Sequence, residues 1–390
     1  MAIFAFFVTG MDEKSKQRIT LSIYFFLSGF CFASWASRIP TIKTVFNFNE
    51  AELGSLLLAM PISSLVGLPI SGWLVSRFDS RIPLMASFFF FSLGLTAIGL
   101  AKTPFMLVAA ICLFSFSMRI LNIAINTQAI TLQKLFNRKI NGSFHGIWST
   151  GGIAGVGFSS LMVKLQVSMA VHLLAVSLIV LLVAIMAFKL LLRNDRSPHG
   201  NKLIIGKPDP FILNLGILIF LAALCEGGMY DWSGVYFKEV IQVEVFTLGY
   251  LVFMIFMALS RFLSDYIIDR LGVEKTYLLS ALLISSGVFI IIVFPFFWPA
   301  MIGFCIVGFG AASIFPMTMT LAGTSKKYSA GMVISIIGTY GILGMFIGPP
   351  LIGYLAHAFD LRISFILFII AGLMLIPFSQ LLFRHQKNQE

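Results

Sequence analysis

Apolar runs of about 20 residues recur along almost the whole chain, and no other feature of the sequence restricts its fold so strongly. A helix needs about 20 such residues to cross a hydrocarbon core of about 30 Å. Hydrophobic residues make up 58% of the 390 residues and charged residues only 11%, whereas soluble domains carry about 25% charge. The sequence therefore excludes a water-soluble fold and predicts an all-α integral membrane protein.

The apolar runs predict twelve membrane-spanning helices. We place them at residues 19–38, 53–76, 82–101, 104–131, 144–163, 168–192, 211–235, 247–268, 276–295, 299–322, 331–356 and 363–384. Twelve spans with short loops fill a chain of this length, so there is no room for a catalytic domain outside the membrane. We therefore do not expect the protein to be an enzyme. The sequence has no P-loop and no metal-ligand motif, and its four cysteines lie within apolar runs, so we expect neither a cofactor nor a metal.

The net charge of +11 is distributed unevenly. With the N-terminus in the cytoplasm, nineteen of the 27 Lys and Arg residues fall in cytoplasmic segments. The opposite side holds only Arg38, Lys43, Lys102, Lys164, Lys238 and Arg362. This is the positive-inside pattern, which predicts two cytoplasmic termini and contact with anionic lipid headgroups. The basic balance therefore indicates topology and no nucleic-acid partner, and the short tails favour a bacterial inner membrane.

The chain repeats itself at an offset of about half its length. Cys31 falls on Cys225 and Cys112 on Cys305 when the chain is shifted by about 194 residues. Two such repeats, with a site at their interface, are the plan of a secondary transporter. We therefore predict two pseudo-symmetric six-helix halves and the following division of the chain: a tail 1–18, a bundle 19–192, a linker 193–210, a bundle 211–384 and a tail 385–390.

One predicted loop carries a family resemblance. The segment from Asp265 to Gly272 resembles the G-x-L-x-D-R-x-G signature of the major facilitator superfamily, and it matches at Asp269, Arg270 and Gly272. The equivalent segment of the first half, Gly72 to Arg81, has Ser76 where the family usually has Asp. The resemblance implies a cytoplasmic network of motif or gating residues, for which the candidates are Arg77, Asp79, Arg81, Asp265, Asp269 and Arg270. Arg261 lies four residues before Asp265 on the same predicted span, so we assign it to this network as well.

Shorter segments resemble a bacterial branch of this superfamily near the sugar and proton symporters. They are Arg38 to Pro40, Asn122 to Asn126, Phe144 to Ser149 and Cys225 to Trp232. The superfamily resemblance also implies that the first, fourth, seventh and tenth spans line a central cavity.

The fourth predicted span has a polar stripe. At about 100° per residue, Ser115, Arg119, Asn122 and Asn126 fall on one face of a helix. Lipid cannot satisfy these groups, so they face either a water-filled cavity or polar groups of a neighbouring helix. We favour the cavity, where they would bind a solute, and keep a hydrogen-bonded seam between helices as the alternative.

Aromatic side chains on the first and seventh spans are candidates for stacking against a solute. Trp35 shares a face with Tyr24 and Ser28, and Tyr230 lies one turn beyond Glu226. Ordinary packing is an equally good interpretation of Trp35.

Two carboxyl groups in the seventh span are candidates for proton coupling. A charged carboxylate is costly within the hydrocarbon region, so Glu226 is by default a functional residue and suits a proton carrier. The alternative is an ion pair in which Arg119 holds Glu226 ionised. Asp231 is the second candidate and lies nearer the outer end of the span.

The sequence thus predicts a monomeric carrier that takes up a small polar solute, such as a sugar or an organic acid, together with protons. The main alternative is a proton-driven antiporter that exports a drug or metabolite, although the fifth span lacks the Gly-Pro pair with which the family's antiporters end it. A non-transporting membrane receptor is a weaker alternative.

Overall fold

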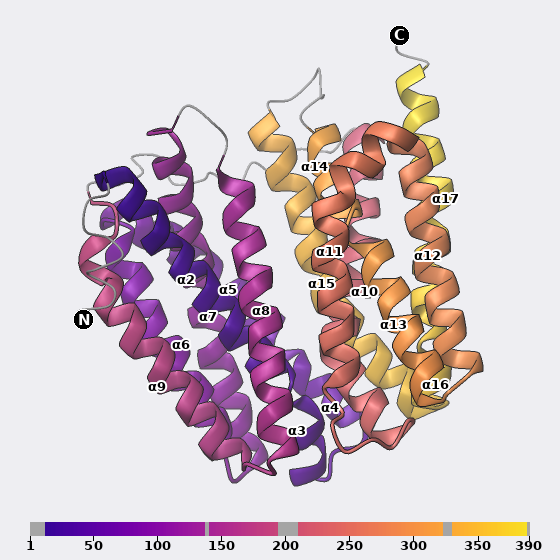
Figure 1. Ribbon diagram of the computed structural model, residues 1–390, viewed down its shortest axis with the longest axis horizontal. Helices are drawn as coiled ribbons and strands as arrows, with labels where there is room; N and C mark the ends of the chain where they lie inside the picture. The colour runs from indigo at the N-terminus through magenta and orange to yellow at the C-terminus, as the bar shows by residue number, and fades with distance from the viewer. Residues whose placement is uncertain (1–11, 137–139, 194–209, 323–329, 388–390) are drawn as a thin grey trace. The chain divides into compact units, whose positions relative to one another are not determined.

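The computed structural model describes residues 12–136, 140–193, 210–322 and 330–387, and most of these residues are helical (Figure 1). The helices in the first part of the chain are α2 (Glu13–Ala36), α3 (Ile39–Val45), α4 (Glu50–Leu57), α5 (Ala59–Arg77), α6 (Arg81–Leu100), α7 (Pro104–Gln133), α8 (Asn141–Lys164), α9 (Met169–Ala187) and the 3-10 turn η1 (Phe188–Leu190). Those that follow are α10 (Pro210–Glu239), α11 (Leu248–Leu271), α12 (Val273–Val293), α13 (Phe297–Ala311), α14 (Ile314–Ala322), α15 (Ala330–Ala358), α16 (Leu361–Ser364) and α17 (Ile366–Lys387).

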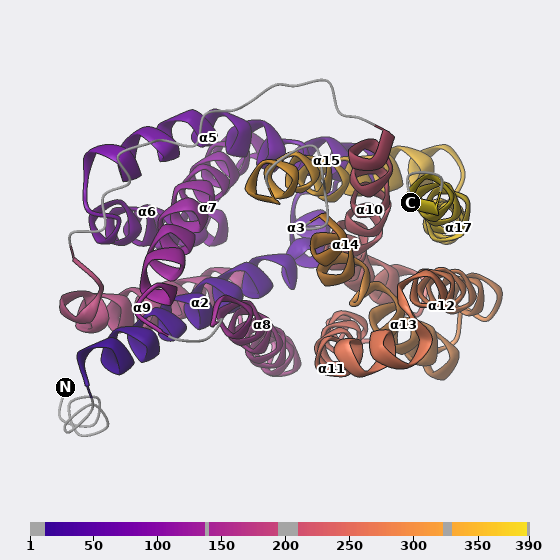
Figure 2. The same cartoon turned by 90° about the horizontal axis from the view of Figure 1, so that it is seen from above.

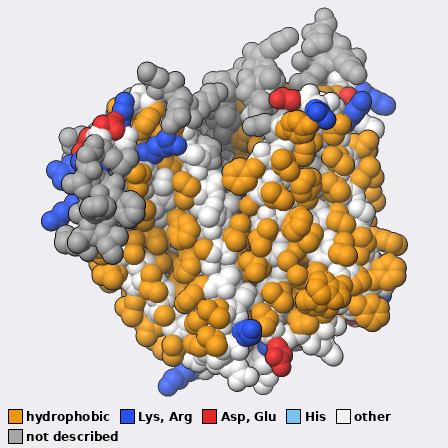
Figure 3. Space-filling view, in the orientation of Figure 1, with side chains coloured by type: hydrophobic (Ala, Val, Ile, Leu, Met, Phe, Trp, Pro, Cys, Tyr) orange, Lys and Arg blue, Asp and Glu red, His pale blue; other side chains and the backbone are white. Residues whose placement is uncertain are grey.

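The described helices confirm the predicted all-helical membrane fold. Eleven helical segments in the described ranges are long and apolar enough to cross a bilayer, and α11 adds a shorter apolar stretch, Leu248–Ser264. Some of these segments join two helices, as α2 with α3 and α4 with α5. Figure 3 shows hydrophobic side chains covering the visible flank of the helices, with Lys and Arg near their ends. This distribution is what hydrocarbon contact requires.

The chain divides into two compact units. The first unit comprises Met1–Arg38 and Ala59–Leu203, and the second comprises Ile39–Leu58 and Ile204–Glu390. This division assigns α3 and α4, which connect α2 to α5 in sequence, to the second unit. We call residues 39–58 the connector.

In the first unit, α2 packs closely against α8 because α8 has glycines on the facing side. A Cβ atom on Gly155 would lie 2.6 Å from the carbonyl oxygen of Phe30, and one on Gly151 would clash with the carbonyl oxygen of Phe26. Backbones can therefore approach only where a side chain is missing. A Cβ atom on Gly157 would have no neighbour within 4 Å, so this glycine is not needed for the close approach of the two backbones.

The second unit repeats this arrangement with α10 and α15. A Cβ atom on Gly348 would lie 2.6 Å from the carbonyl oxygen of Leu224, and one on Gly344 would clash with that of Phe220. The first and fifth spans of one half thus pair as the first and fifth spans of the other half do, which is the predicted pseudo-symmetry. Around this pair in the second unit, α12 packs against both α13 and α17 (Figure 2).

The turn between α11 and α12 depends on one glycine. Gly272 has a φ of +77°, a left-handed conformation that other residues adopt only with strain. It ends α11 and begins α12 without an intervening loop. The glycine of the motif at the end of α11 is therefore required by the backbone.

Candidate functional site

The polar stripe of the first unit lies on α7. Thr103 caps this helix, because its hydroxyl accepts a hydrogen bond from the backbone N–H of Met106, and Pro104 occupies the first turn. Ser115 donates to the carbonyl oxygen of Met60 on α5 at 2.6 Å. This end of the stripe therefore forms a hydrogen bond between helices, as the seam alternative describes.

Arg119 continues the stripe toward α5 but keeps hydrogen-bonding capacity. Its Nε donates to the hydroxyl of Ser64 on α5 at 2.7 Å. In the described part of the chain the two terminal nitrogens of its guanidinium group make no hydrogen bond or ion pair. The side chain is only half-buried. Arg119 is thus positioned by one neutral hydroxyl and retains donors that suit a carboxylate or hydroxyl ligand.

The two amides further along α7 are half-buried. Asn126 donates from its Nδ2 to the backbone carbonyl of Asn122 one turn earlier, at 2.7 Å. This bond fixes the orientation of the Asn126 amide on the helix surface. In the described part of the chain the side-chain carbonyl of Asn126 and the side-chain amide of Asn122 make no hydrogen bond, so both residues keep groups that can contact a solute.

Trp35 lies in the core of the first unit. Its side chain is fully buried, and its ring packs at 45° against Phe114 with a centroid distance of 6.0 Å. Its Nε1 has no hydrogen-bond partner among the described residues. The structure therefore gives Trp35 the surroundings of a packing residue.

In the second unit, Glu226 of α10 has two partners. The hydroxyl of Tyr230, one turn later on α10, donates to its Oε1, and so does the guanidinium of Arg261 on α11, at 3.2 Å. The carboxyl and guanidinium groups are mostly buried, with 14% and 29% of their side chains exposed. The partner of Glu226 is thus Arg261, a residue that the sequence assigned to the motif network, whereas the alternative considered there was Arg119.

Aromatic side chains surround Tyr230. Its ring meets those of Tyr250 and Phe253 edge to face at centroid distances of 5.6 and 5.8 Å, and its hydroxyl lies 3.8 Å from the sulfur of Met257. Tyr230 is 2% exposed. Asp231 follows it on α10 and is half-buried, with no hydrogen bond or ion pair to any described residue.

The motif residues of the first unit lie at the turn between α5 and α6. Asp79 is buried, and its carboxylate lies 3.9 Å from the Nε of Arg81. Arg81 also stacks over the ring of Phe188 at 5.7 Å. Arg77 is exposed at the end of α5 and lies 5.9 Å from the ring of Trp73. The turn thus holds an ion pair in which Asp79 is the acid.

The motif residues of the second unit lie at the end of α11. Asp269 and Arg270 are exposed, and the guanidinium of Arg270 lies 4.7 Å above the ring of Tyr266. The side chain of Asp265 is outside the part of the chain that the structure describes. Among the described side chains of this group, Arg261 alone is shown in contact with the interior cluster on α10.

An ion cluster in the second unit was not predicted. Lys43 of the connector binds the carboxylates of Glu50, also in the connector, and Glu239 at the end of α10, at 2.9 and 2.6 Å. Lys238 donates to the carbonyl oxygen of Pro40 at 3.2 Å. We call the pairs of Lys43 with Glu50 and Glu239 the connector cluster. It fixes the connector to α10.

The connector also packs against α15. A Cβ atom on Gly54 would lie 3.1 Å from the Cα of Gly353, so α4 and α15 approach at two facing glycines. A capping box formed by Asn49 and Glu52 begins α4 and holds this helix in register. The sequence gives no sign of these contacts, because Lys43 and Glu239 lie in separate predicted loops.

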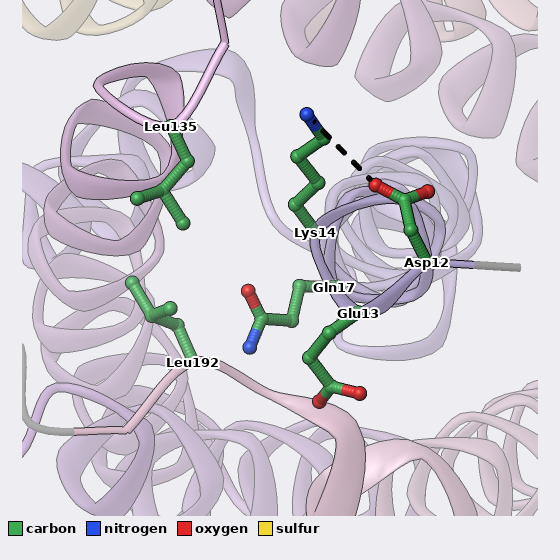
Figure 4. A pocket seen from close by; sticks show the side chains of 6 residues that line it. All are labelled: Asp12, Glu13, Lys14, Gln17, Leu135 and Leu192. Atoms are coloured by element: carbon green, nitrogen blue, oxygen red, sulfur yellow. Dashed lines mark ion pairs between the residues drawn. The ribbon is translucent and has the colours of Figure 1, made fainter.

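A shallow depression of about 470 Å³ lies at the start of α2 in the first unit (Figure 4). It is lined by Asp12, Glu13, Lys14, Gln17, Leu135 and Leu192. Lys14 and Asp12 form an exposed ion pair of 4.0 Å beside it. None of the predicted solute-binding or proton-binding residues lines this depression.

Two further residues complete the deep polar clusters and were missed from the sequence. Ser64 of α5 orients Arg119, and Tyr250 of α11 packs on Tyr230. Tyr250, Met257 and Arg261 recur at intervals of seven and four residues on one face of α11, and this pattern was the available signal. Ser64 had none, because serine is common in spans.

Comparison with known proteins places the fold. The family model described as "Major Facilitator Superfamily" matches residues 21–341 and 251–390. An "uncharacterized MFS-type transporter" of Yersinia pestis is 32% identical over 90% of this chain and 91% of its own length. The "membrane protein MosC" of Rhizobium meliloti is 30% identical over 97% of this chain and 94% of its own length.

Solved structures share the same fold at low identity. The nucleoside transporter NupG superposes with a TM-score of 0.75 at 14% identity, over 96% of this chain and 99% of its own. A bacterial homologue of the human lysosomal transporter Spinster, in an inward-facing and occupied conformation, gives 0.76 at 15% identity, over 96% and 98%. These two likenesses concern the architecture alone.

Proposed function

Because the chain belongs to the major facilitator superfamily of secondary transporters, which are not enzymes, we propose that it takes up a small polar solute together with protons. The solute class is a sugar or an organic acid. Two repeats that alternate access to a central site would carry out the transport. We place this carrier in a bacterial inner membrane as a monomer surrounded by lipid, with both termini in the cytoplasm.

The observation that carries this proposal is the pair of Glu226 and Arg261, with Tyr230 as the third member. A buried carboxylate is stable only while it is paired and hydrogen-bonded. Tyr230 and Arg261 satisfy the Oε1 of Glu226 in this conformation. If a conformational change withdrew Arg261, Glu226 would take up a proton in its place. This exchange couples the charge of one carboxyl to the state of the carrier, as proton symport requires.

Solute binding is assigned to the residues with unused donors and acceptors. Arg119 offers two guanidinium nitrogens, and Asn122 and Asn126 offer amide groups on the same face of α7. Tyr230 contributes an aromatic surface in the second unit. Ser115 and Trp35 support this site from the packed side of their helices, and Asp231 is the second carboxyl available for a proton.

The connector affects how the carrier would change between its two access states. Residues 39–58 link two helices of the first unit and yet pack as part of the second. Movement between states therefore bends the chain at both ends of the connector, near Arg38 and near Leu58. Arg38 stiffens one end, because its guanidinium donates to His172 Nδ1 and to the carbonyl oxygen of Val167, both at 2.9 Å.

The test is uptake into proteoliposomes under an imposed pH gradient, with sugars and organic acids as solutes. We expect saturable uptake that requires the gradient, and we expect Glu226→Gln to lose it, because glutamine keeps the shape and cannot exchange a proton. Glu244→Gln is the matched control, since Glu244 is exposed in the loop after α10. Full proton-driven uptake by Glu226→Gln would remove Glu226 from the mechanism. Solute efflux in exchange for protons would favour the antiporter.

A further inference from the structure

The second unit contains a buried hydroxyl without a partner. Tyr250 is 2% exposed, and its hydroxyl makes no hydrogen bond to any described residue. Burying a hydroxyl unpaired costs about 1–3 kcal/mol in proteins, so such groups are rare unless something else completes them. The other large buried tyrosines behave differently. The hydroxyl of Tyr277 pairs with Thr318 at 2.7 Å, and that of Tyr236 donates to the carbonyl oxygen of Ile291 at 2.6 Å.

Tyr250 stands beside a second unsatisfied group. Its ring contacts that of Tyr230, and the next residue of α10 is Asp231, whose carboxyl has no bond to the described residues. Asp231 is thus one residue along α10 from the ring that packs on Tyr250, and α10 lies beside α11. The hydroxyl of Tyr250 and the carboxyl of Asp231 do not satisfy each other in this conformation.

We propose that Tyr250 and Asp231 form a subsite that binds hydroxyl groups of a neutral polyhydroxylated solute, beside the pair of Glu226 and Arg261. This inference rests on the proposed function and narrows its solute class.

The chemistry of the two groups selects the ligand. A hydroxyl both donates and accepts hydrogen bonds. One hydroxyl of a solute can therefore accept from the phenol of Tyr250, and another can donate to the Asp231 carboxyl when it is ionised or accept from it when it is protonated. An ammonium group pairs with a carboxylate but cannot accept from Tyr250. A solute carboxylate accepts from Tyr250 but meets two acids, Glu226 and Asp231, against one cation, Arg261. Hydroxyl groups are therefore the best match.

The surrounding side chains suit the rest of such a solute. Tyr230, Tyr250 and Phe253 provide aromatic surfaces within about one turn of the two polar groups. The C–H faces of a sugar ring pack on aromatic rings, while its hydroxyls reach outward to fixed donors and acceptors.

The experiment measures binding to the full-length protein in nanodiscs by thermal shift and by titration. The probes are neutral pentoses, hexoses and hexitols, with the uronic acids and amino sugars of the same carbon skeletons. We expect at least one neutral sugar or hexitol to raise the Tm and its matched acid and amine to bind more weakly. Stabilisation by acids or amines alone, or by none of these probes, would overturn the assignment of solute class.

Tyr250→Phe tests the subsite itself. Removing the hydroxyl should weaken binding of the neutral probe about tenfold, the upper range for one hydrogen bond. The same change should raise the Tm of the solute-free protein, because it deletes a buried donor that has no partner. The control is Tyr277→Phe, which breaks a bond to Thr318 and should lower the Tm while leaving the affinity unchanged. Unchanged affinity in Tyr250→Phe would refute the subsite.

Asp231→Asn tests the basis of selectivity. Asparagine keeps a hydrogen-bonding group and removes the charge, so the matched uronic acid should gain affinity relative to the neutral sugar. An unchanged preference would show that Asp231 does not act on the solute. These binding measurements need no pH gradient. Unaltered affinity in Tyr250→Phe with gradient-dependent uptake lost in Glu226→Gln would reject the subsite and leave the proposed function standing.

Discussion

Arg119 in the first unit and Glu226 in the second are both ionisable groups deep within a span, but their surroundings differ. The Nε of Arg119 donates one hydrogen bond to the neutral hydroxyl of Ser64. Glu226, by contrast, accepts hydrogen bonds from both a guanidinium group and a phenol. The first unit therefore keeps a positive charge with unused donors, and the second neutralises its glutamate internally. The contrast is therefore between an arginine that is arranged to receive a ligand and a glutamate that is arranged to change its own charge state.

The largest expected effect is a difference in stability between variants that remove Arg261 and variants that remove Arg119. Arg261→Ala leaves the buried Glu226 without its cation and should lower the free energy of unfolding by about 3–5 kcal/mol. Arg119→Ala removes a cation that has no ionic partner among the described residues, so it should cost far less. Thermal unfolding in one detergent measures both. Equal losses would mean that Arg119 is also paired and would end the contrast between the units.

A double variant sharpens that test. Glu226→Gln combined with Arg261→Met removes both charges and should recover most of the stability lost in Arg261→Ala, because no unpaired charge remains. If the double variant does not recover this stability, the loss in Arg261→Ala comes from the packing of the Arg261 side chain and not from an unpaired charge.

The next effect concerns the feature in which the two units agree. Gly155→Ala in the first unit and Gly348→Ala in the second place a methyl group 2.6 Å from a carbonyl oxygen, and each should cost about 1–3 kcal/mol. Gly157→Ala and Gly338→Ala are the matched controls, since no atom lies within 4 Å of the added carbon. These controls should be neutral or stabilising by up to about 1 kcal/mol, as alanine favours a helix. The Tm values of all four variants test whether the equivalent glycines of the two halves contribute similarly to stability.

The smallest effect concerns the connector. Glu239→Gln leaves Lys43 paired with Glu50 alone, and the partly exposed pair that is lost should contribute about 0.2–1 kcal/mol. The Tm should fall slightly at low ionic strength, and the difference from the unmodified protein should shrink in high salt. A large loss that is independent of salt would show that the connector cluster is better shielded than its exposure indicates.

Some of the fold follows directly from local pattern. Apolar runs of span length leave no alternative to helices, and the repeat predicts two similar halves. The structure adds that the first and fifth spans pair in each half, where glycines of α8 and α15 allow the backbones to approach closely. The glycine of the motif at the end of α11 is similarly explained by the positive φ of Gly272.

The partners of the deep polar residues were less predictable. A helical stripe identifies Ser115 and Arg119 as one face of α7, but it does not say which neighbouring helix lies opposite. Arg261 was grouped with Asp265 because the two are four residues apart, and its contact with Glu226 depends instead on α11 lying beside α10. Periodicity describes a single helix, whereas an ion pair between helices depends on their relative rotation and height.

The sequence by itself determined a membrane protein of two repeated halves, with a few ionisable groups placed where lipid would not tolerate them. That much is local, because hydropathy and helical period act over one span at a time. Only the tertiary structure decided that Glu226 pairs with Arg261, that the connector belongs with the second unit and that Tyr250 has an unpaired hydroxyl. These features arise between segments far apart in the chain, where close packing selects one partner among many that the sequence permits.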